Sequence, residues 1–163
     1  MSAAWTRAAR YTSWRYIVGT YVIVSLVGHL AWELLQLPLY TIFWTEPPGY
    51  IAYATAHCTA GDMLTALFTF FFAIVVMNRT KRLTERTYIR VALLTIFLGF
   101  AYTLFSEWLN VSIRESWTYT SAMPRLPVLG TGLAPLLQWL VIPTLALSSA
   151  WRRARRMERN QPT

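Results

Sequence analysis

The sequence has few charged residues for its length and almost no cysteine. Only 13% of its 163 residues are Asp, Glu, Lys or Arg, about half the share that a soluble globular domain carries. Together with 55% hydrophobic residues, this composition excludes a disordered chain, a coiled coil and an ordinary water-soluble fold. The single cysteine, Cys58, excludes a disulfide framework and a zinc or iron–sulfur site built on cysteines. The length allows one domain.

The chain has instead four apolar runs, each long enough for a helix that crosses a bilayer, which takes about 20 residues. They cover residues 17–37, 55–77, 91–109 and 131–150. Backbone groups inside lipid must pair within the protein, so each run is predicted to be helical, even where β-branched and aromatic residues follow one another. The sequence therefore predicts an all-α, polytopic membrane protein with a bundle of four transmembrane helices.

The basic residues predict how this bundle is oriented. Of the 15 Lys and Arg residues, two (Arg114 and Arg125) fall between the third and fourth runs, and the remaining 13 lie before the first run, between the second and third, or after the fourth. This distribution predicts that both termini are cytoplasmic. Residues 1–16 are then an interfacial segment, residues 17–151 the transmembrane domain and residues 152–163 a basic tail. We expect a bacterial inner membrane location and no nucleic-acid partner.

Two outer segments differ in composition from simple linkers. Residues 38–54 and 110–130 carry tryptophan, tyrosine and proline in place of serine and glycine. Because aromatic side chains favour the membrane–water interface, we expect both segments to fold back as caps over the outer end of the bundle.

Ionisable groups inside the predicted helices mark a candidate site, since such groups are costly in a membrane. They are His29 and Glu33 in the first run, His57 and Asp62 in the second, and Glu107 in the third. At 1.5 Å of rise per residue, these groups all lie in the outer third of the bilayer, roughly 3–12 Å below its outer boundary. The sequence therefore predicts one polar pocket in the outer leaflet.

Helical spacing predicts which of these groups share a face. In the first run, polar residues recur at steps of three or four: Tyr21, Ser25, His29, Glu33, Gln36 and Tyr40. Glu107, Asn110 and Arg114 form a similar set at the end of the third run. His57 precedes Asp62 by five residues and so points about 140° away from it, towards the rim of the pocket.

This group of residues predicts acid–base chemistry. A carboxyl group beside a histidine can exchange protons at neutral pH, so His29, Glu33 and Glu107 are the predicted proton carriers and Asp62 assists them. Tryptophan faces can stabilise a carbocation. The predicted substrate-binding residues are Trp32, Trp108, Asn110, Gln138 and Trp139. We expect a cofactor-free membrane enzyme that isomerises or cyclises a lipidic substrate.

A resemblance to a known family favours the same chemistry. Four spans, His29-x-x-x-Glu33 on the first, a further glutamate (Glu107) on an inner helix, and Gln138-Trp139 on the last look like the EXPERA domain, the family of emopamil-binding-protein-like sterol isomerases. The resemblance implies that His29 and Glu33 handle one proton and Glu107 the other, while Trp139 stabilises the cation. It also implies an isoprenoid or sterol-like substrate.

Two other classes of function stay open at this stage. His29, Glu33, His57 and Asp62 could bind a first-row metal, and the two histidines could hold a haem axially. No His-x-x-His or Glu-x-x-His pattern supports such a site. The chain could also be a non-catalytic subunit of a membrane complex, contacting lipids or a partner. The sequence leaves open whether the chain forms a homo-oligomer.

Overall fold

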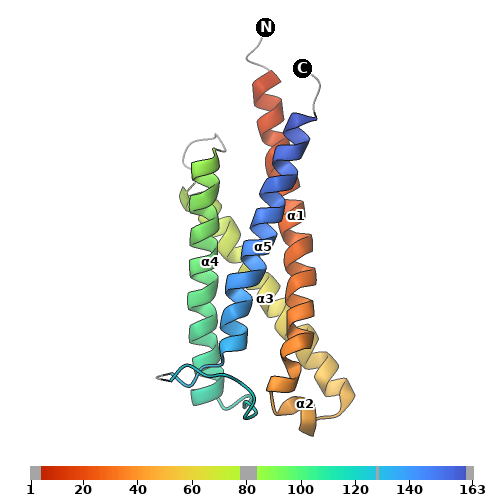
Figure 1. The fold of residues 1–163 in the computed structure, drawn as a ribbon, viewed down its shortest axis with the longest axis vertical. Coiled ribbons are helices and arrows are strands. Elements are labelled where there is room, and N and C mark those ends of the chain that lie inside the picture. The colour runs from red at the N-terminus through yellow and green to blue at the C-terminus, as the bar shows by residue number, and fades with distance from the viewer. Residues whose placement is uncertain (1–4, 78–83, 128, 161–163) are drawn as a thin grey trace.

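Long helices dominate the computed structural model, which describes residues 5–77, 84–127 and 129–160, with side chains from Tyr16 onward. Four of them run the length of the molecule: α1 (Trp5–Gln36), α3 (Pro48–Met77), α4 (Glu85–Trp108) and α5 (Leu133–Arg159) (Figure 1). Short elements join them: a 3-10 segment η1 (Leu37–Leu39), α2 (Ile42–Thr45) and a π-helical segment η2 (Leu109–Ile113). No strand occurs among the described residues.

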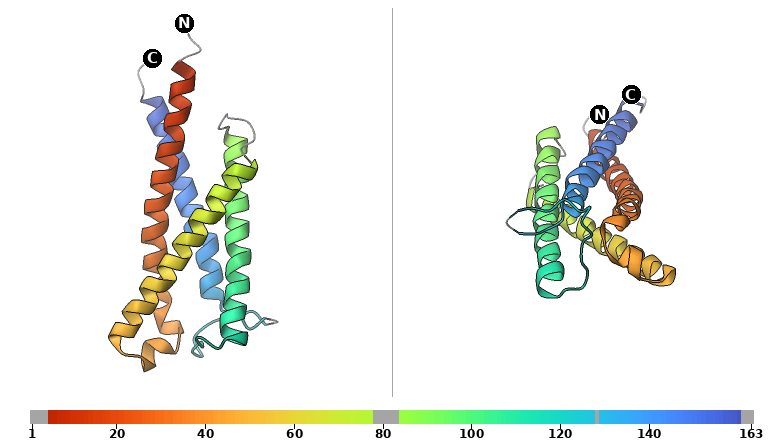
Figure 2. Two further views of the ribbon diagram at one scale, coloured as in Figure 1. Left: turned by 180° about the vertical axis from the view of Figure 1, so that it is seen from behind. Right: turned by 60° about the horizontal axis from the view of Figure 1, so that its bottom comes forward.

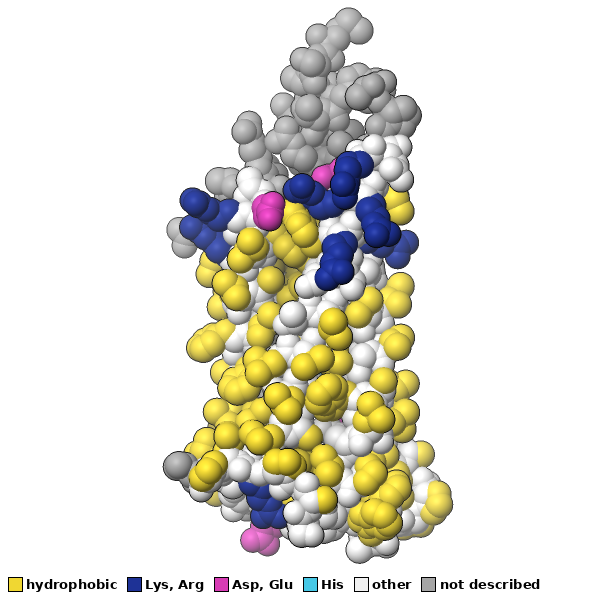
Figure 3. Space-filling view, in the orientation of Figure 1, with side chains coloured by type: hydrophobic (Ala, Val, Ile, Leu, Met, Phe, Trp, Pro, Cys, Tyr) yellow, Lys and Arg dark blue, Asp and Glu magenta, His cyan; other side chains and the backbone are white. Residues whose placement is uncertain are grey.

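Each long helix contains a segment long and apolar enough to cross a membrane. These segments are Tyr16–Leu39, Pro48–Met77, Glu85–Ile113 and Leu133–Arg159. Their outward side chains are apolar, as Leu35, Phe68 and Phe97 illustrate, each being more than half exposed. Figure 3 shows this hydrophobic surface between an end rich in Lys and Arg and an end with few charges. The predicted all-helical architecture with four membrane-length helices is thus confirmed, and it indicates a multi-pass membrane protein.

The four helices do not run parallel. α1 begins and α5 ends at the same end of the bundle, which we call the terminal end (Figure 1). The opposite end, the loop end, carries α2 and residues 109–127 and 129–132. α1 and α5 pack along each other, whereas α3 crosses the bundle diagonally, lying beside α1 near the loop end and beside α4 near the terminal end (Figure 2). α3 and α4 therefore diverge towards the loop end.

Prolines and caps determine where the helices begin and end. α1 ends at Gln36 just before Pro38, because the residue before a proline is disfavoured in the helical conformation. α3 begins at Pro48, where the missing N–H costs nothing. α4 begins after Thr84, whose side chain accepts a hydrogen bond from the Thr87 backbone.

The observed boundaries differ from the predicted ones. Residues 5–16, predicted as a separate interfacial segment, continue α1 without a break, and α5 extends to Arg159 into the predicted basic tail. Residues 1–4 and 161–163 of these segments lie outside the described residues. The outer segment 38–54 is not a loop, since it contains η1, α2 and the first seven residues of α3. Helical hydrogen bonds thus continue beyond the ends of the apolar runs. Hydropathy alone therefore does not predict where the helices begin and end.

Close helix contacts rely on glycine and on tyrosine hydroxyl groups. Gly99 on α4 lies against the ring of Trp139 on α5, so that a Cβ atom there would overlap the ring. The Tyr21 hydroxyl donates to the Ala66 carbonyl on α3 (3.2 Å), and the Tyr88 hydroxyl donates to the Leu147 carbonyl on α5 (2.6 Å). Such hydrogen bonds replace the hydrophobic driving force that is missing between helices in lipid.

Candidate functional site

A cavity of about 510 Å³ lies between the four long helices in the half of the bundle near the loop end. Each long helix contributes to its wall. Its polar and aromatic lining includes Glu33, Gln36, Tyr40, Asp62, Tyr102, Glu107, Asn110, Trp117, Gln138 and Trp139. Three carboxyl groups from three different helices therefore face one cavity, as the predicted pocket requires.

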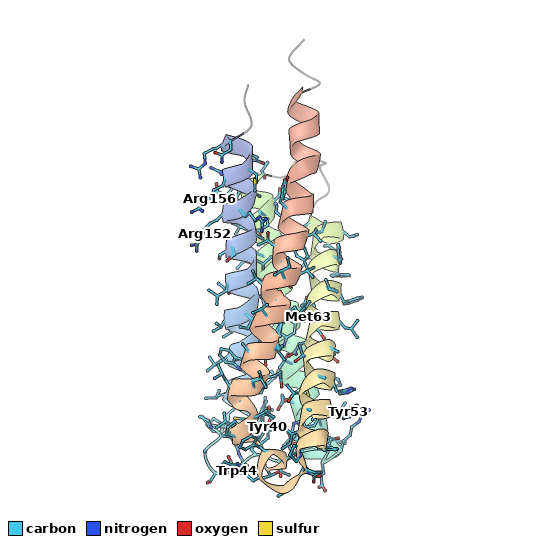
Figure 4. The ribbon with its side chains drawn as sticks, turned by 90° about the vertical axis from the view of Figure 1, so that its right-hand side faces the viewer. Tyr40, Trp44, Tyr53, Met63, Arg152 and Arg156 are labelled. Carbon is cyan, nitrogen blue, oxygen red and sulfur yellow. The ribbon has the colours of Figure 1, made fainter. Side chains whose placement is uncertain are left out.

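The cavity opens sideways where α3 and α4 diverge. Tyr53 on α3 and Tyr102 on α4 both line it, and they are 64% and 54% exposed. Figure 4 shows Tyr53 on the outward side of α3 and Tyr40 among the helices. His57, next to Tyr53, is also exposed and stacks on its ring at 5.7 Å. Both tyrosines belong to membrane-length segments, Tyr53 to that of α3 and Tyr102 to that of α4.

The polar stripe predicted on α1 is buried along its whole length. All six of its residues point into the bundle: Tyr21, Ser25, His29, Glu33, Gln36 and Tyr40. Near the loop end it meets α3 and α5, whose own polar side chains lie at the same depth. The spacing argument therefore identified the correct face of this helix.

Gln138 connects His29 to Asp62. Its amide nitrogen lies 2.9 Å from Nδ1 of His29 and donates to Oδ2 of Asp62 at 2.7 Å. The direct separation between His29 Nδ1 and Asp62 Oδ2 is longer, at 3.5 Å. An amide group can donate one hydrogen to each of two partners, and His29 Nδ1 is then the acceptor. His29 is fully buried and does not line the cavity, so it reaches the cavity only through Asp62 and Gln138.

Glu33 belongs to the same network through Gln36. The Gln36 amide donates to Oε1 of Glu33 at 2.9 Å and approaches Oε1 of Gln138 at 3.5 Å. Glu33 also lies close enough to Asp62 for the two carboxyl groups to interact. Glu33 and Asp62 thus form a carboxyl pair with amide donors, and no Lys or Arg within the described ranges forms an ion pair with either.

Glu107 occupies a second polar centre, built by the loop that follows η2. The Tyr119 hydroxyl donates to Oε2 of Glu107 and accepts from the Gly132 backbone N–H at 3.1 Å. Tyr119 pairs with Tyr40 across the loop end, with ring centroids 5.4 Å apart. Arg125 covers the outer face of the Tyr119 ring at 5.3 Å. The two outer segments therefore bind each other and close the cavity floor.

Tyr119 was not among the predicted site residues. It lies 12 positions after Glu107, beyond the end of α4, η2 and a stretch of irregular loop. A loop of this kind has no periodicity from which a contact could be predicted. The one available signal is a tyrosine in an outer segment near an intramembrane acid, which is too common to identify a pair.

Burial raises the pKa of Tyr119 above its ordinary value near 10, and the Glu107 carboxylate raises it further. The pKa of Tyr40 is raised for the same two reasons. In the unfolded chain both hydroxyls ionise near pH 10, so the folded protein should keep its stability below that pH and lose it as the pH rises further. Each tyrosine can contribute a slope of about 1.4 kcal/mol per pH unit in that range.

We expect Tyr119→Phe to make this alkaline loss of stability shallower while lowering stability at neutral pH, because its hydrogen bond to Glu107 is lost. Thermal unfolding of detergent-purified protein between pH 7 and about pH 11 measures both effects. An alkaline slope identical in the wild type and the variant would contradict the assignment to Tyr119.

Two predicted binding residues lie away from the cavity. Trp32 is half-buried and donates from its indole nitrogen to the Ala134 carbonyl at 3.1 Å, which joins α1 to the first turn of α5. Trp108 is 39% exposed and packs on Phe105 at the outer surface of α4. Neither residue lines the cavity, and their predicted binding of substrate stays a prediction.

Other predicted residues lie where the pocket requires them. Trp139 is buried, lines the cavity and lies 5.2 Å from the His29 ring. Asn110 also lines it, held by a hydrogen bond to the Ser106 carbonyl at 2.9 Å. The residues considered for a metal do not converge. His57 is exposed and His29 enclosed, and no group of three or more His, Cys, Asp or Glu residues within the described part of the chain could hold an ion.

The fold and the site together define a class, that of helical multi-pass membrane proteins with a polar cavity inside the bundle. No known protein family, curated protein or solved structure matches the chain. What the cavity does must therefore be argued from its own chemistry.

Proposed function

We propose that the protein is a membrane enzyme that isomerises or cyclises a lipidic substrate by proton transfer to and from carbon. One observation supports this most directly. Each of the three cavity carboxyl groups is hydrogen-bonded by a neutral donor, Gln36 for Glu33, Gln138 for Asp62 and Tyr119 for Glu107. A carboxylate held by an arginine stays ionised, whereas one held by amide or hydroxyl groups can take up and release a proton.

The proposed reaction uses the two polar centres in turn. A protonated carboxyl group of the Glu33 and Asp62 pair gives its proton to one carbon of a substrate double bond, and a carbocation forms at the other carbon. Glu107 accepts a proton from a carbon next to the cation, so that the double bond returns at a new position. Proton and charge balance, because one acid has lost the proton that the other has gained.

Other side chains of the cavity can stabilise the carbocation and bind the substrate. Trp139 and Tyr40 line the cavity wall, and aromatic rings there can stabilise a transient carbocation. Gln36 has a buried Oε1 atom without a partner among the described residues, which a substrate hydroxyl could satisfy. A cavity of about 510 Å³ is within the range of small-molecule sites. An isoprenoid or sterol-like substrate, which the EXPERA resemblance implies, fits these features.

The placement in the membrane is part of the proposal. The positive-inside rule orients the terminal end towards the cytoplasm, because it carries nearly all of the Lys and Arg residues (Figure 3). The cavity then lies in the outer leaflet of, as we propose, a bacterial inner membrane. A lipid would enter it between α3 and α4.

Transfer of solvent deuterium tests this function even while the substrate is unidentified. The purified protein is incubated in D2O with a lipid extract containing isoprenoids and sterol-like lipids, and the lipids are then analysed by mass spectrometry. We expect wild type to incorporate carbon-bound deuterium into one lipid class. Asp62→Asn should lower the rate by about a hundredfold or more, since a positioned acid or base contributes about 10²–10⁴-fold.

Glu46→Gln is the matched control, because it makes a similar change at an exposed position that does not line the cavity. It should exchange deuterium as fast as wild type. A lipid that co-purifies with wild type but never gains deuterium would refute the enzymatic proposal and leave a lipid-binding subunit.

A further inference from the structure

A second hollow, of about 600 Å³, lies at the terminal end between α1 and α5. Its lining residues are Thr20 on α1, the α5 residues Ser149, Arg152, Arg153, Arg156 and Met157, and Asn160 directly after α5. Figure 4 shows Arg152 and Arg156 one above the other on the same side of α5, and Figure 3 shows Lys and Arg gathered at this end. The proposed reaction has no use for this surface.

The lining of this hollow carries arginines and no acidic residue. The adjoining hollow between α4 and α5 contains Glu85, which lies 3.7 Å from Arg155. Arg152 and Arg156 line both hollows, and Arg153 lines the hollow beside α1. The hollow beside α1 thus offers basic side chains to an anion without a carboxylate in its wall.

A buried hydroxyl points to a ligand independently of the arginines. Thr20 is 8% exposed, and its Oγ1 atom has no hydrogen-bond partner among the described residues. A buried polar atom of this kind is costly unless it is paired. An anion held by the arginines of α5 would supply the missing acceptor, with Ser149 as a further donor.

We propose that this hollow is a binding site for a phosphate group. Arginine guanidinium groups bind phosphate oxygens in a two-pronged geometry, and serine and threonine hydroxyls complete such sites. Thr20 lies four residues inside the membrane-length segment that begins at Tyr16, which places the hollow at the depth of lipid headgroups. The phosphate can belong to an acidic phospholipid or to a soluble anion, and the experiment separates these sources.

Native mass spectrometry of the full-length protein in detergent measures binding of phosphatidylglycerol, with phosphatidylcholine as the neutral comparison. We expect wild type to bind phosphatidylglycerol more tightly. Arg152→Gln combined with Arg153→Gln should weaken this binding by about 30-fold, from about 1 kcal/mol for each basic residue. Thr20→Val, which leaves the charge unchanged, should weaken it by about tenfold through the lost hydrogen bond.

Arg86→Gln combined with Arg90→Gln is the matched control, since it removes the same charge from α4 without touching the hollow. Its binding should stay within about threefold of wild type, because screened, distant charges act weakly. Equal losses in the two double variants, or an unchanged Thr20→Val, would overturn the site. Inorganic phosphate that displaces phosphatidylglycerol would identify a soluble anion as the occupant, and failure to displace it would identify the lipid.

Discussion

Replacing Glu107 with glutamine is expected to abolish deuterium transfer to the lipid substrate in a protein that still folds. The glutamine oxygen can still accept the hydrogen bond of Tyr119, so the floor of the cavity keeps its structure. What the variant loses is the ability to hold a proton. Glu107 is buried and no Lys or Arg among the described residues pairs with it, so its carboxyl group can take up and release a proton. A loss of about 10²–10⁴-fold is expected.

Two comparisons separate chemistry from structure in this experiment. Tyr119→Phe keeps the carboxyl group but removes its donor, and should slow exchange less than Glu107→Gln does. Thermal unfolding should show Glu107→Gln close to wild type. Full activity of Glu107→Gln would refute the proposed role of Glu107, and a variant that fails to fold would show that the carboxyl group is structural.

Much of the site could be predicted because helical periodicity and depth in the membrane are both properties of the sequence. The steps of three and four along α1 placed His29, Glu33 and Gln36 on one buried face. Counting residues from the ends of the apolar runs placed both Asp62 and Glu107 in the outer third of the bilayer. Both arguments depend only on the geometry of a continuous helix, which lipid enforces.

The contacts between helices could not be predicted in the same way. His29 and Glu33 lie four residues apart on one helix, yet His29 contacts Gln138 on α5, which in turn donates to Asp62 on α3. Which partner a side chain meets depends on how α1, α3 and α5 are rotated against each other. A hydropathy pattern contains no information on that rotation when a helix is apolar on most faces.

The direction in which each tryptophan side chain points could not be predicted from the sequence either. Trp32 and Trp108 each adjoin an intramembrane glutamate in the sequence, but adjacent residues on a helix point about 100° apart. Trp32 therefore contacts the backbone of α5, and Trp108 faces outward. Trp139 lies in the cavity because it follows Gln138 on a helix that other helices surround, so that both residues are buried.

The largest effect on stability is expected from Gly99→Ala. A methyl group at Gly99 would overlap two carbons of the Trp139 ring, and Trp139 is only 1% exposed. Overpacking of a core costs about 1–3 kcal/mol, whereas alanine gains up to about 1 kcal/mol over glycine within a helix. We expect the cost of overpacking to exceed the gain in helix propensity, because a rigid indole ring cannot adjust its shape as a flexible side chain can.

Gly19→Ala provides the control, since a methyl group at this position of α1 meets no atom within 4 Å. Thermal unfolding in detergent should therefore show Gly99→Ala less stable and Gly19→Ala as stable as wild type or more so. A Gly99→Ala protein with wild-type stability would contradict the close contact of α4 with α5. Since Trp139 also lines the cavity beside His29, we expect Gly99→Ala to slow deuterium exchange as well, although Gly99 does not line the cavity.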